Sequence, residues 1–450
     1  MTEGSIAKKI TLFALPIFFG SLFQQLYNTI DAVVVGNVVG KEALAAVTST
    51  GSLINLLVGL IQGIFIGAGV VIARYYGAKD MEAVGKTAHT DLAFALAASV
   101  GLTLVGVLFT PQLLTWMGTP ADVMDSSVSY LRWYFAGSLG IIMYNACSGI
   151  FRAVGDSRHP LYYLITASVI NVVLDLLLVP AMGVAGAALA TSVSQLLSAA
   201  LAFHKLTRTD GPNRIQPRQI RFHRGYLREI VAMGLPTGIQ NSVISFANVV
   251  VQTNVNAFGA EAMAGTGSYN KLEGFVFLPI QSFCMALTTF VSQNIGARQY
   301  DRARGGARFG ILSCVSAAIL VGAVMLAWGR PLLTLFDSDP AVLQFGMLSN
   351  RIRAGFYALL AVSHVMAAVL RGAGRSKVPM VIMLVCWCLI RVSYITITVH
   401  FIPDIRVVYW AHPITWALSS VIFLLYYFKA DWLHASRRAG DNLPTAEEAG

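Results

Sequence analysis

Long apolar runs alternate with short, polar and often basic segments along most of the chain, and this pattern predicts an all-α polytopic membrane protein. About 20 consecutive apolar residues are enough for a helix to cross the hydrocarbon core of a bilayer. We therefore predict twelve transmembrane helices, at residues 10–36, 48–73, 90–110, 128–151, 160–180, 184–204, 229–257, 265–293, 308–328, 344–370, 378–401 and 408–428.

The composition agrees with this class and accounts for the basic charge. Of the 450 residues, 56% are hydrophobic and 12% are charged, and the mean hydropathy of +0.65 is too high for a soluble domain. The net charge of +10 arises from lysines and arginines that gather in alternate loops. By the positive-inside rule, both termini are predicted to be cytoplasmic, in a multi-pass protein of the plasma or inner cell membrane. No nucleic-acid partner is implied.

Several kinds of chemistry find no support in the sequence. The cysteines all lie in apolar segments, which is typical of small buried side chains rather than of a disulfide or metal site; they are Cys147, Cys284, Cys314, Cys386 and Cys388. No phosphate-binding Gly-x-x-x-x-Gly-Lys-Ser/Thr loop and no His-Glu-x-x-His zinc motif occurs. We therefore expect neither an enzyme nor a pump driven directly by ATP. We also expect no cleaved signal peptide, because the first apolar stretch is a full span with no small-residue cleavage site after it.

The chain repeats itself at a period of about 220 residues. The clearest copy sets Arg152-Ala-Val-Gly-Asp-Ser-Arg-His-Pro160 against Arg371-Gly-Ala-Gly-Arg-Ser-Lys-Val-Pro379, and Leu15-Pro16 returns as Leu235-Pro236. Each copy holds six predicted helices, an even number, so the two halves are parallel repeats around a central cleft. The predicted organisation is an N-terminal six-helix bundle at 1–204, a cytoplasmic linker at 205–228, a C-terminal six-helix bundle at 229–430 and a disordered tail at 431–450.

The first predicted helix carries a carboxylate, Asp31, where an unpaired charge costs roughly 2.5–3.5 kcal/mol. Gln24, Asn28 and Asp31 recur at i, i+4 and i+7 and so share one helical stripe. Pro16 removes a backbone hydrogen bond near the start of the helix. We interpret this helix as the ion-sensing, moving part of a transporter, with Pro16 as its hinge.

The fifth predicted helix supplies a second carboxylate. Asn171 and Asp175 are four residues apart on one face, and Thr191 and Tyr130 are predicted at a similar depth in their own helices. Two carboxylates close together in a low dielectric resist double ionisation, so the group would hold a proton, or its oxygens could ligate sodium. Alternatively, Asp175 caps a helix end and Tyr130 belongs to an interfacial aromatic belt.

These features together resemble the multidrug and toxic compound extrusion (MATE) family, and the likeness covers about residues 8–430. The resemblance implies that Asp31, Asn171 and Asp175 bind the coupling ion, helped by Thr191 and Tyr130, and that the first helix bends at Pro16. One branch of the family carries further acids in the second half. This chain has Ile244 near one such position, which places coupling in the first repeat.

The second repeat carries charges of its own. Glu273 and Arg391 lie inside predicted helices, and we predict that they either pair with each other or that Glu273 contacts substrate. His364 is expected to be a core histidine rather than a titrating group. The residues predicted to line the substrate cavity are Gln24, Tyr27, Asn28, Tyr134, Glu273 and Arg391.

The function predicted from these observations is secondary active efflux of small organic cations in exchange for H⁺ or Na⁺, by alternating access and by a monomer. No cofactor is expected beyond the coupling ion, which is bound at Asp31, Asn171, Asp175 and Thr191 if it is sodium. Two alternatives stay open. The same polar cluster could line an ion channel, and the same fold could flip a lipid-linked precursor.

Overall fold

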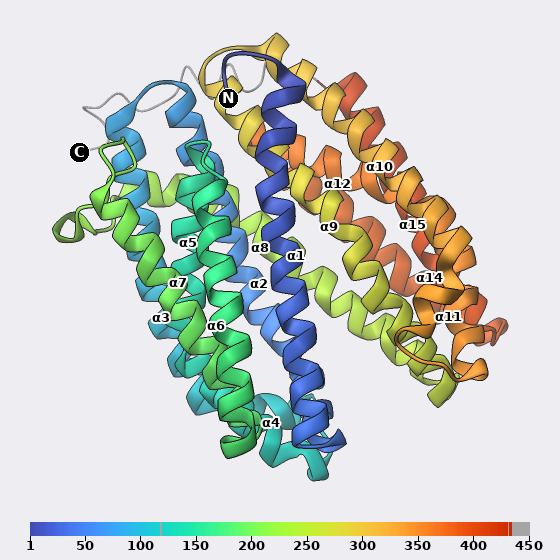
Figure 1. Ribbon diagram of the computed structural model, residues 1–450. Coiled ribbons are helices and arrows are strands. Elements are labelled where there is room, and N and C mark those ends of the chain that lie inside the picture. The colour runs from blue at the N-terminus through green and yellow to red at the C-terminus, as the bar shows by residue number, and fades with distance from the viewer. Residues whose placement is uncertain (118, 431, 434–450) are drawn as a thin grey trace. The chain divides into compact units, whose positions relative to one another are not determined.

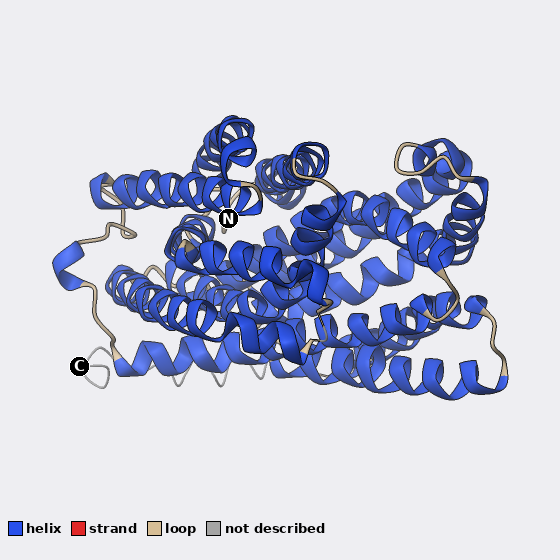
Figure 2. Ribbon diagram, turned by 90° about the horizontal axis from the view of Figure 1, so that it is seen from below, coloured by secondary structure: helices blue, strands red, loops and turns tan. Residues whose placement is uncertain are grey.

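The computed structural model describes residues 1–117, 119–430 and 432–433, and these residues form helices joined by short loops (Figures 1 and 2). The first half contains α1 (Ile6–Val38), α2 (Lys41–Gly77), α3 (Met81–Trp116), α4 (Ala121–Ala136), α5 (Ser138–Ala153), α6 (Arg158–Met182) and α7 (Val184–Arg208). The second half contains α8 (Arg224–Asn256), α9 (Ala260–Gly296), α10 (Tyr300–Thr334), α11 (Pro340–Arg353), α12 (Tyr357–Gly372), α13 (Lys377–Met383), α14 (Arg391–Phe401) and α15 (Ile405–Lys429). Three short segments complete the set: η1 (Pro217–Gln219), η2 (Ala354–Phe356) and the π-helical η3 (Leu384–Ile390).

The predicted membrane-spanning architecture is confirmed. Within the described residues, 11 helices are long and apolar enough to cross a membrane, or up to 12 if α4 and α5, which meet at a 47° bend, form one span. Gly137 lies at this bend, between the two helices. Most helices extend several residues beyond the predicted apolar cores, because polar residues at the ends continue the helical hydrogen bonding past the hydrocarbon region. The predicted tail at 431–450 lies outside the described residues, apart from 432–433.

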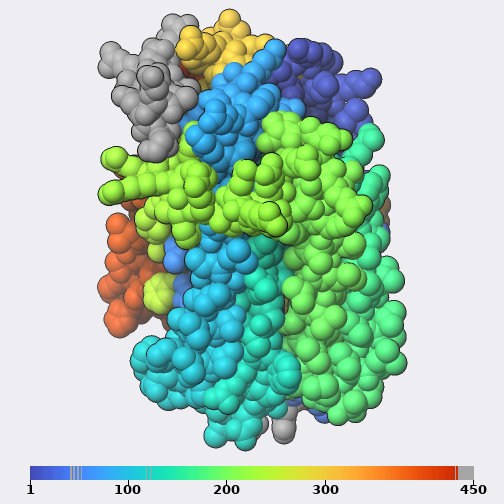
Figure 3. Space-filling model, turned by 90° about the vertical axis from the view of Figure 1, so that its left-hand side faces the viewer, coloured from blue at the N-terminus to red at the C-terminus, as the bar shows by residue number. Residues whose placement is uncertain are grey.

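One compact unit comprises residues 19–235. In it α7 packs against α5 and α6, and small residues permit the close approach, since a Cβ at Gly140 would lie 2.5 Å from the backbone nitrogen of Leu196. The connection between α7 and α8 lies across this unit (Figure 3), where the Gln216 N–H donates to His89 Nε2 at 3.0 Å.

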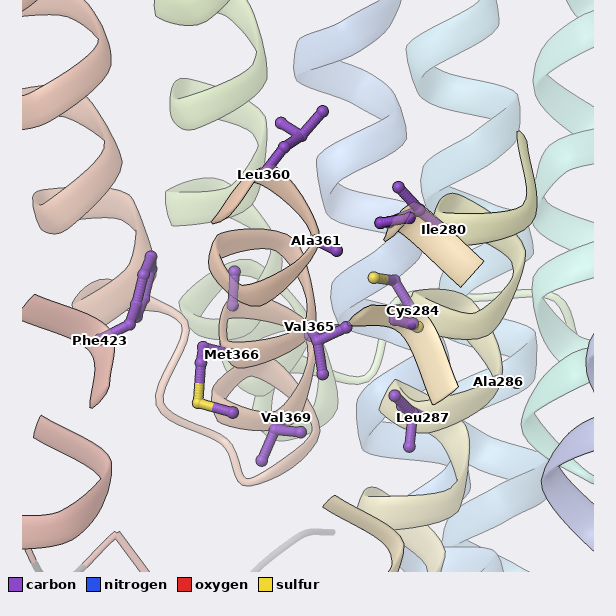
Figure 4. Close-up of a cluster of buried hydrophobic side chains, with 14 of the residues drawn as sticks. Ile280, Cys284, Ala286, Leu287, Leu360, Ala361, Val365, Met366, Val369 and Phe423 are labelled. Atoms are coloured by element: carbon purple, nitrogen blue, oxygen red, sulfur yellow. The ribbon is translucent and has the colours of Figure 1, made fainter. Parts of the chain in front are cut away.

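The other compact unit comprises residues 1–18 together with the described residues from 236 to 433. Its core lies between α9 and α12, where Ile280, Cys284 and Leu287 face Ala361 and Val365 (Figure 4). Ile10 and Phe13 from the start of α1 belong to the same apolar cluster. The boundaries between the units follow Phe18 and Leu235, so each falls within two residues of a proline inside a helix, Pro16 or Pro236.

Candidate functional site

The predicted ion-coupling residues all lie in the unit of residues 19–235, on α1, α4, α6 and α7. Asp31 is 7% exposed, and both Asn171 and Asp175 are completely buried. Tyr130 is also buried, and Thr191 is half-buried. The i, i+4 spacing on α6 sets Asn171 and Asp175 on the same side of the helix, which is the side that the unit buries.

Hydrogen bonds and charge proximity connect these side chains. Asn171 Nδ2 donates to Thr191 Oγ1 at 3.4 Å, which joins α6 to α7. Asp31 lies close enough to Asp175 and to Tyr130 for their charges to interact. The structure therefore gathers the acidic and polar residues that the sequence placed on separate helices.

Four buried side-chain oxygens of this cluster lack hydrogen-bond donors among the described residues. Asp31 Oδ1, Asn171 Oδ1 and both side-chain oxygens of Asp175 are buried and accept no hydrogen bond from the described residues. A buried, unpaired carboxylate is strongly unfavourable, so the group requires a proton or a cation. Since no three His, Cys, Asp or Glu side chains gather as a metal-binding group in the described part of the chain, a sodium ion would depend on the amide and hydroxyl oxygens as well.

The polar stripe predicted on α1 combines buried and exposed side chains. Tyr27 and Asp31 are buried, whereas Gln24 and Asn28 are exposed on this unit. Tyr27 OH accepts a hydrogen bond from Gln195 Nε2 at 3.2 Å, which connects α1 to α7.

Tyr134 lies beside the cluster and is half-buried. Its ring stacks on that of Tyr130, with ring centroids 6.2 Å apart. The stacked pair presents two hydroxyl groups and two aromatic faces from a single helix, α4.

The sequence-based prediction did not include two buried polar residues of this unit, Gln195 and Asp91. Gln195 follows Thr191 by one helical turn, and that spacing could have flagged it. Asp91 is 1% exposed inside α3, and its Oδ1 has no hydrogen-bond partner among the described residues. The sequence does place the Asp91 carboxylate at the start of a long apolar segment, shortly after the loop charges Glu82 and Lys86.

The predicted pairing of Glu273 with Arg391 is wrong. Glu273 Oε2 instead accepts a hydrogen bond from Arg353 Nη2, and Arg353 Nη1 donates to Asn270 Oδ1 at 3.1 Å. The Arg353 guanidinium also lies 4.6 Å from the centroid of the Tyr269 ring. The reason is structural: α9 packs directly against α11, which carries Arg353 as its last residue.

Arg391 is 2% exposed and begins α14, directly after the π-helical segment η3. Its Nε and Nη2 both donate to Thr415 Oγ1, at 3.2 and 2.9 Å, and it lies 5.0 Å from the centroid of the Trp387 ring. In the described part of the chain no carboxylate lies within ion-pairing distance of it. Arg391 therefore keeps one edge of its guanidinium without an acceptor from the described residues.

His364 and Pro16 complete the sequence-based candidates. The His364 ring packs against Phe277 and Trp387, with centroids 4.6 and 5.3 Å apart, as expected for a side chain of the core. Pro16 lies inside α1, which is helical on both sides of it.

Comparison with known proteins gives a consistent result. A family model described as MatE matches residues 16–177 and again residues 236–397, so the two matches begin 220 residues apart, as the duplication predicts. The "Probable multidrug resistance protein YoeA" of Bacillus subtilis is 27% identical over 95% of this chain and 94% of its own length. The "FAD transporter" of Shewanella oneidensis is 22% identical over 94% of each. A solved structure titled as the outward-facing conformation of a multidrug resistance MATE family transporter has a TM-score of 0.89 at 23% identity, over 97% of both chains.

Proposed function

Because this chain belongs to the MATE family, whose members are transporters rather than enzymes, we propose that it exports small organic cations in exchange for H⁺ or Na⁺. The exchange would follow an alternating-access cycle. The protein is a multi-pass membrane protein, and the charge pattern of its loops favours the plasma membrane with both termini in the cytoplasm.

The observation that carries this proposal is the buried, donor-poor acidic cluster of α1 and α6. Asp31 and Asp175 are within electrostatic reach of each other, and three of their oxygens have no hydrogen-bond donor in the described part of the chain. Binding a proton or a sodium ion would neutralise charge there, and release would restore the repulsion. A site with two states of charge in the membrane interior is what ion-coupled transport needs.

Alternating access also requires a moving element, and α1 provides it in this proposal. Pro16 leaves one carbonyl without its helical hydrogen bond, so α1 can bend there at low cost. The unit boundary after Phe18 lies next to this proline. Ion binding at Asp31 on the same helix would then favour one shape of α1 over the other.

The test is efflux of ethidium from proteoliposomes, driven in turn by a proton gradient and by a sodium gradient. Asp31→Asn and Asp175→Asn remove charge at nearly constant shape, and each should lower gradient-driven efflux by at least about tenfold, equivalent to roughly 1.4 kcal/mol. Asp125→Asn, an exposed aspartate on α4 of the same unit, is the matched control and should transport normally. Wild-type rates in both cluster variants would refute the coupling site. Current without counter-exchange would indicate a channel instead.

A second candidate function is export of molecules that carry an acidic group, and Arg391 favours it. Among the described residues, one edge of its buried guanidinium has no acceptor, and arginine binds carboxylate or phosphate through two parallel hydrogen bonds. The relative named as an FAD transporter, which aligns along almost the entire chain, supports considering such a substrate.

FAD uptake into proteoliposomes separates the two candidates. If the second candidate is correct, Arg391→Gln should reduce FAD transport and leave ethidium transport unchanged. Arg351 is an exposed arginine near the Glu273–Arg353 ion pair, and the control variant Arg351→Gln should transport FAD normally. Absence of FAD transport by the wild-type protein would remove this candidate and leave the first untouched.

A further inference from the structure

Two adjoining pockets lie between the beginning of α10 and the end of α15. Their volumes are about 560 and 210 Å³, and Arg304 and Leu433 line both of them. The larger volume falls within the range typical of small-molecule sites. The other described lining residues are Arg298, Gln299, Tyr300, Asp301 and Arg302 in the larger pocket, and Arg308, Tyr427, Phe428, Ala430 and Trp432 in the smaller one.

The pockets are strongly basic, and two of their arginines are available to a ligand. Arg302 is already engaged, since it donates to the Met1 carbonyl and lies over the Phe290 ring. Arg304 is exposed, and among the described residues its one ion pair is a 3.7 Å contact with the fully exposed Asp301, a kind of surface pair that contributes little. Arg308 is exposed, lies close enough to Tyr427 to interact with it, and makes no ion pair within the part of the chain that the structure describes.

Apolar, outward-facing stripes on both helices lead away from these pockets. On α10, Leu312 follows Arg304 and Arg308 at spacings of four, so the three share one face, and Leu312 is 68% exposed. On α15, Val421, Leu425 and Phe428 recur at i, i+4 and i+7 and are 54%, 51% and 78% exposed. In a membrane-spanning helix such a stripe faces lipid.

Aromatic side chains mark the junction between the basic pockets and the apolar stripes. Tyr427 and Trp432 line the smaller pocket beside Arg304 and Arg308, and their rings stack with centroids 5.3 Å apart. Tyrosine and tryptophan are enriched at the level of lipid headgroups, where one end of the side chain is apolar and the other is wet. Basic, aromatic and apolar side chains therefore adjoin one another at this end of α10 and α15.

We propose that this end of α10 and α15 (Figure 1) is a binding site for an anionic phospholipid. The phosphate of the headgroup binds Arg304 and Arg308, and the acyl chains follow the stripes that begin at Leu312 and Phe428. A soluble anion would use the charge alone, whereas a phospholipid matches the charge, the aromatic rim and the apolar faces together. The positive-inside rule predicts that this end is cytoplasmic, where anionic lipids attract basic segments.

Native mass spectrometry of the full-length protein tests the proposal, with equal amounts of phosphatidylglycerol and phosphatidylcholine supplied in the same micelles. The wild-type protein should retain phosphatidylglycerol preferentially. Each arginine near a membrane surface contributes roughly a fivefold factor, so the double variant Arg304→Gln/Arg308→Gln should retain about 25-fold less. Both side chains are exposed, so the fold should be unaffected, and an unchanged melting temperature checks this.

The matched control removes two exposed arginines from the opposite ends of the same two helices, as Arg330→Gln/Arg406→Gln. It should leave phosphatidylglycerol retention unchanged. Equal loss in the control, or no loss in the Arg304/Arg308 variant, would overturn the proposal. So would competition by soluble glycerol phosphate as effective as that by the lipid, because the site would then recognise only a free phosphate.

Discussion

Glu273→Gln should destabilise the compact unit that contains α9 and α11, because it leaves the buried charge of Arg353 without its carboxylate partner. Arg353 is held between α9 and α11 with a side chain only 4% exposed, and Glu273 is the one carboxylate that contacts it in the described residues. The glutamine keeps the shape of the side chain and one acceptor oxygen but removes the charge. The substitution therefore isolates the electrostatic part of the contact.

The size of the effect follows from the burial of the pair. Removing one partner of a fully buried pair costs roughly 3–5 kcal/mol. Here Glu273 is 19% exposed, and Arg353 keeps its bond to Asn270 and its contact with the Tyr269 ring, so we expect a loss at the lower end, about 3 kcal/mol. Denaturant titration in mixed micelles, followed by tryptophan fluorescence, measures the change in the free energy of unfolding.

A double-mutant cycle identifies the partner. Glu273→Gln combined with Arg353→Gln should recover much of the loss, with a coupling energy of about 2 kcal/mol or more. Arg391 is the matched control, because it is an equally buried arginine of the same unit that contacts Thr415 instead. Its coupling to Glu273 should be less than about half as large. Additive losses with Arg353, or stronger coupling to Arg391, would refute the assignment.

Three further predictions concern Pro16 in α1 and the compact unit of residues 19–235. Spin labels at the exposed positions Leu12 and Leu26 should lie about 21 Å apart along a straight α1. In Pro16→Ala, the distance between the labels should lose any dependence on pH or sodium. A dependence equal to that of the wild-type protein would make Pro16 an ordinary tolerated proline. Asn171→Ala should impair ethidium efflux less than Asp175→Asn does, because it removes an amide ligand and no charge; an equal or larger defect would contradict this order. Gly140→Val should lower the melting temperature, because a Cβ there meets the α7 backbone, whereas Gly101→Val, with open space at its Cβ, should not; equal melting of the two variants would show that the α5–α7 approach tolerates bulk.

The helices could be predicted from the sequence because a single physical requirement sets them. In a bilayer each backbone polar group must be satisfied within the helix, so an apolar run of sufficient length predicts a helix almost by itself. The predicted spans at 184–204 and 378–401 correspond to helical segments Val184–Arg208 and Lys377–Phe401. The bend between α4 and α5 and the π-helical segment η3 were not predicted, because hydropathy carries no information on local helix geometry.

The site residues show where prediction from sequence stops. Spacing showed that Asn171 and Asp175 share a face, but it could not show how deeply each residue of a stripe is buried. On α1, Asp31 is buried, whereas Gln24 and Asn28 are exposed. The partner of Glu273 depends on which helix packs against α9. That is a property of tertiary structure, so the sequence offered Arg391, another charge inside a predicted helix, but could not identify Arg353.

The most direct test of the central claim is ion movement driven by substrate alone. Proteoliposomes loaded with a pH-sensitive or sodium-sensitive dye, with no gradient imposed, receive an inward ethidium gradient, and the coupling ion should move outward in exchange. The account predicts this counter-flow for the wild-type protein and for Asp125→Asn, and its loss in Asp31→Asn/Asp175→Asn. Ethidium movement with neither proton nor sodium counter-flow, or undiminished counter-flow in the double variant, would contradict it.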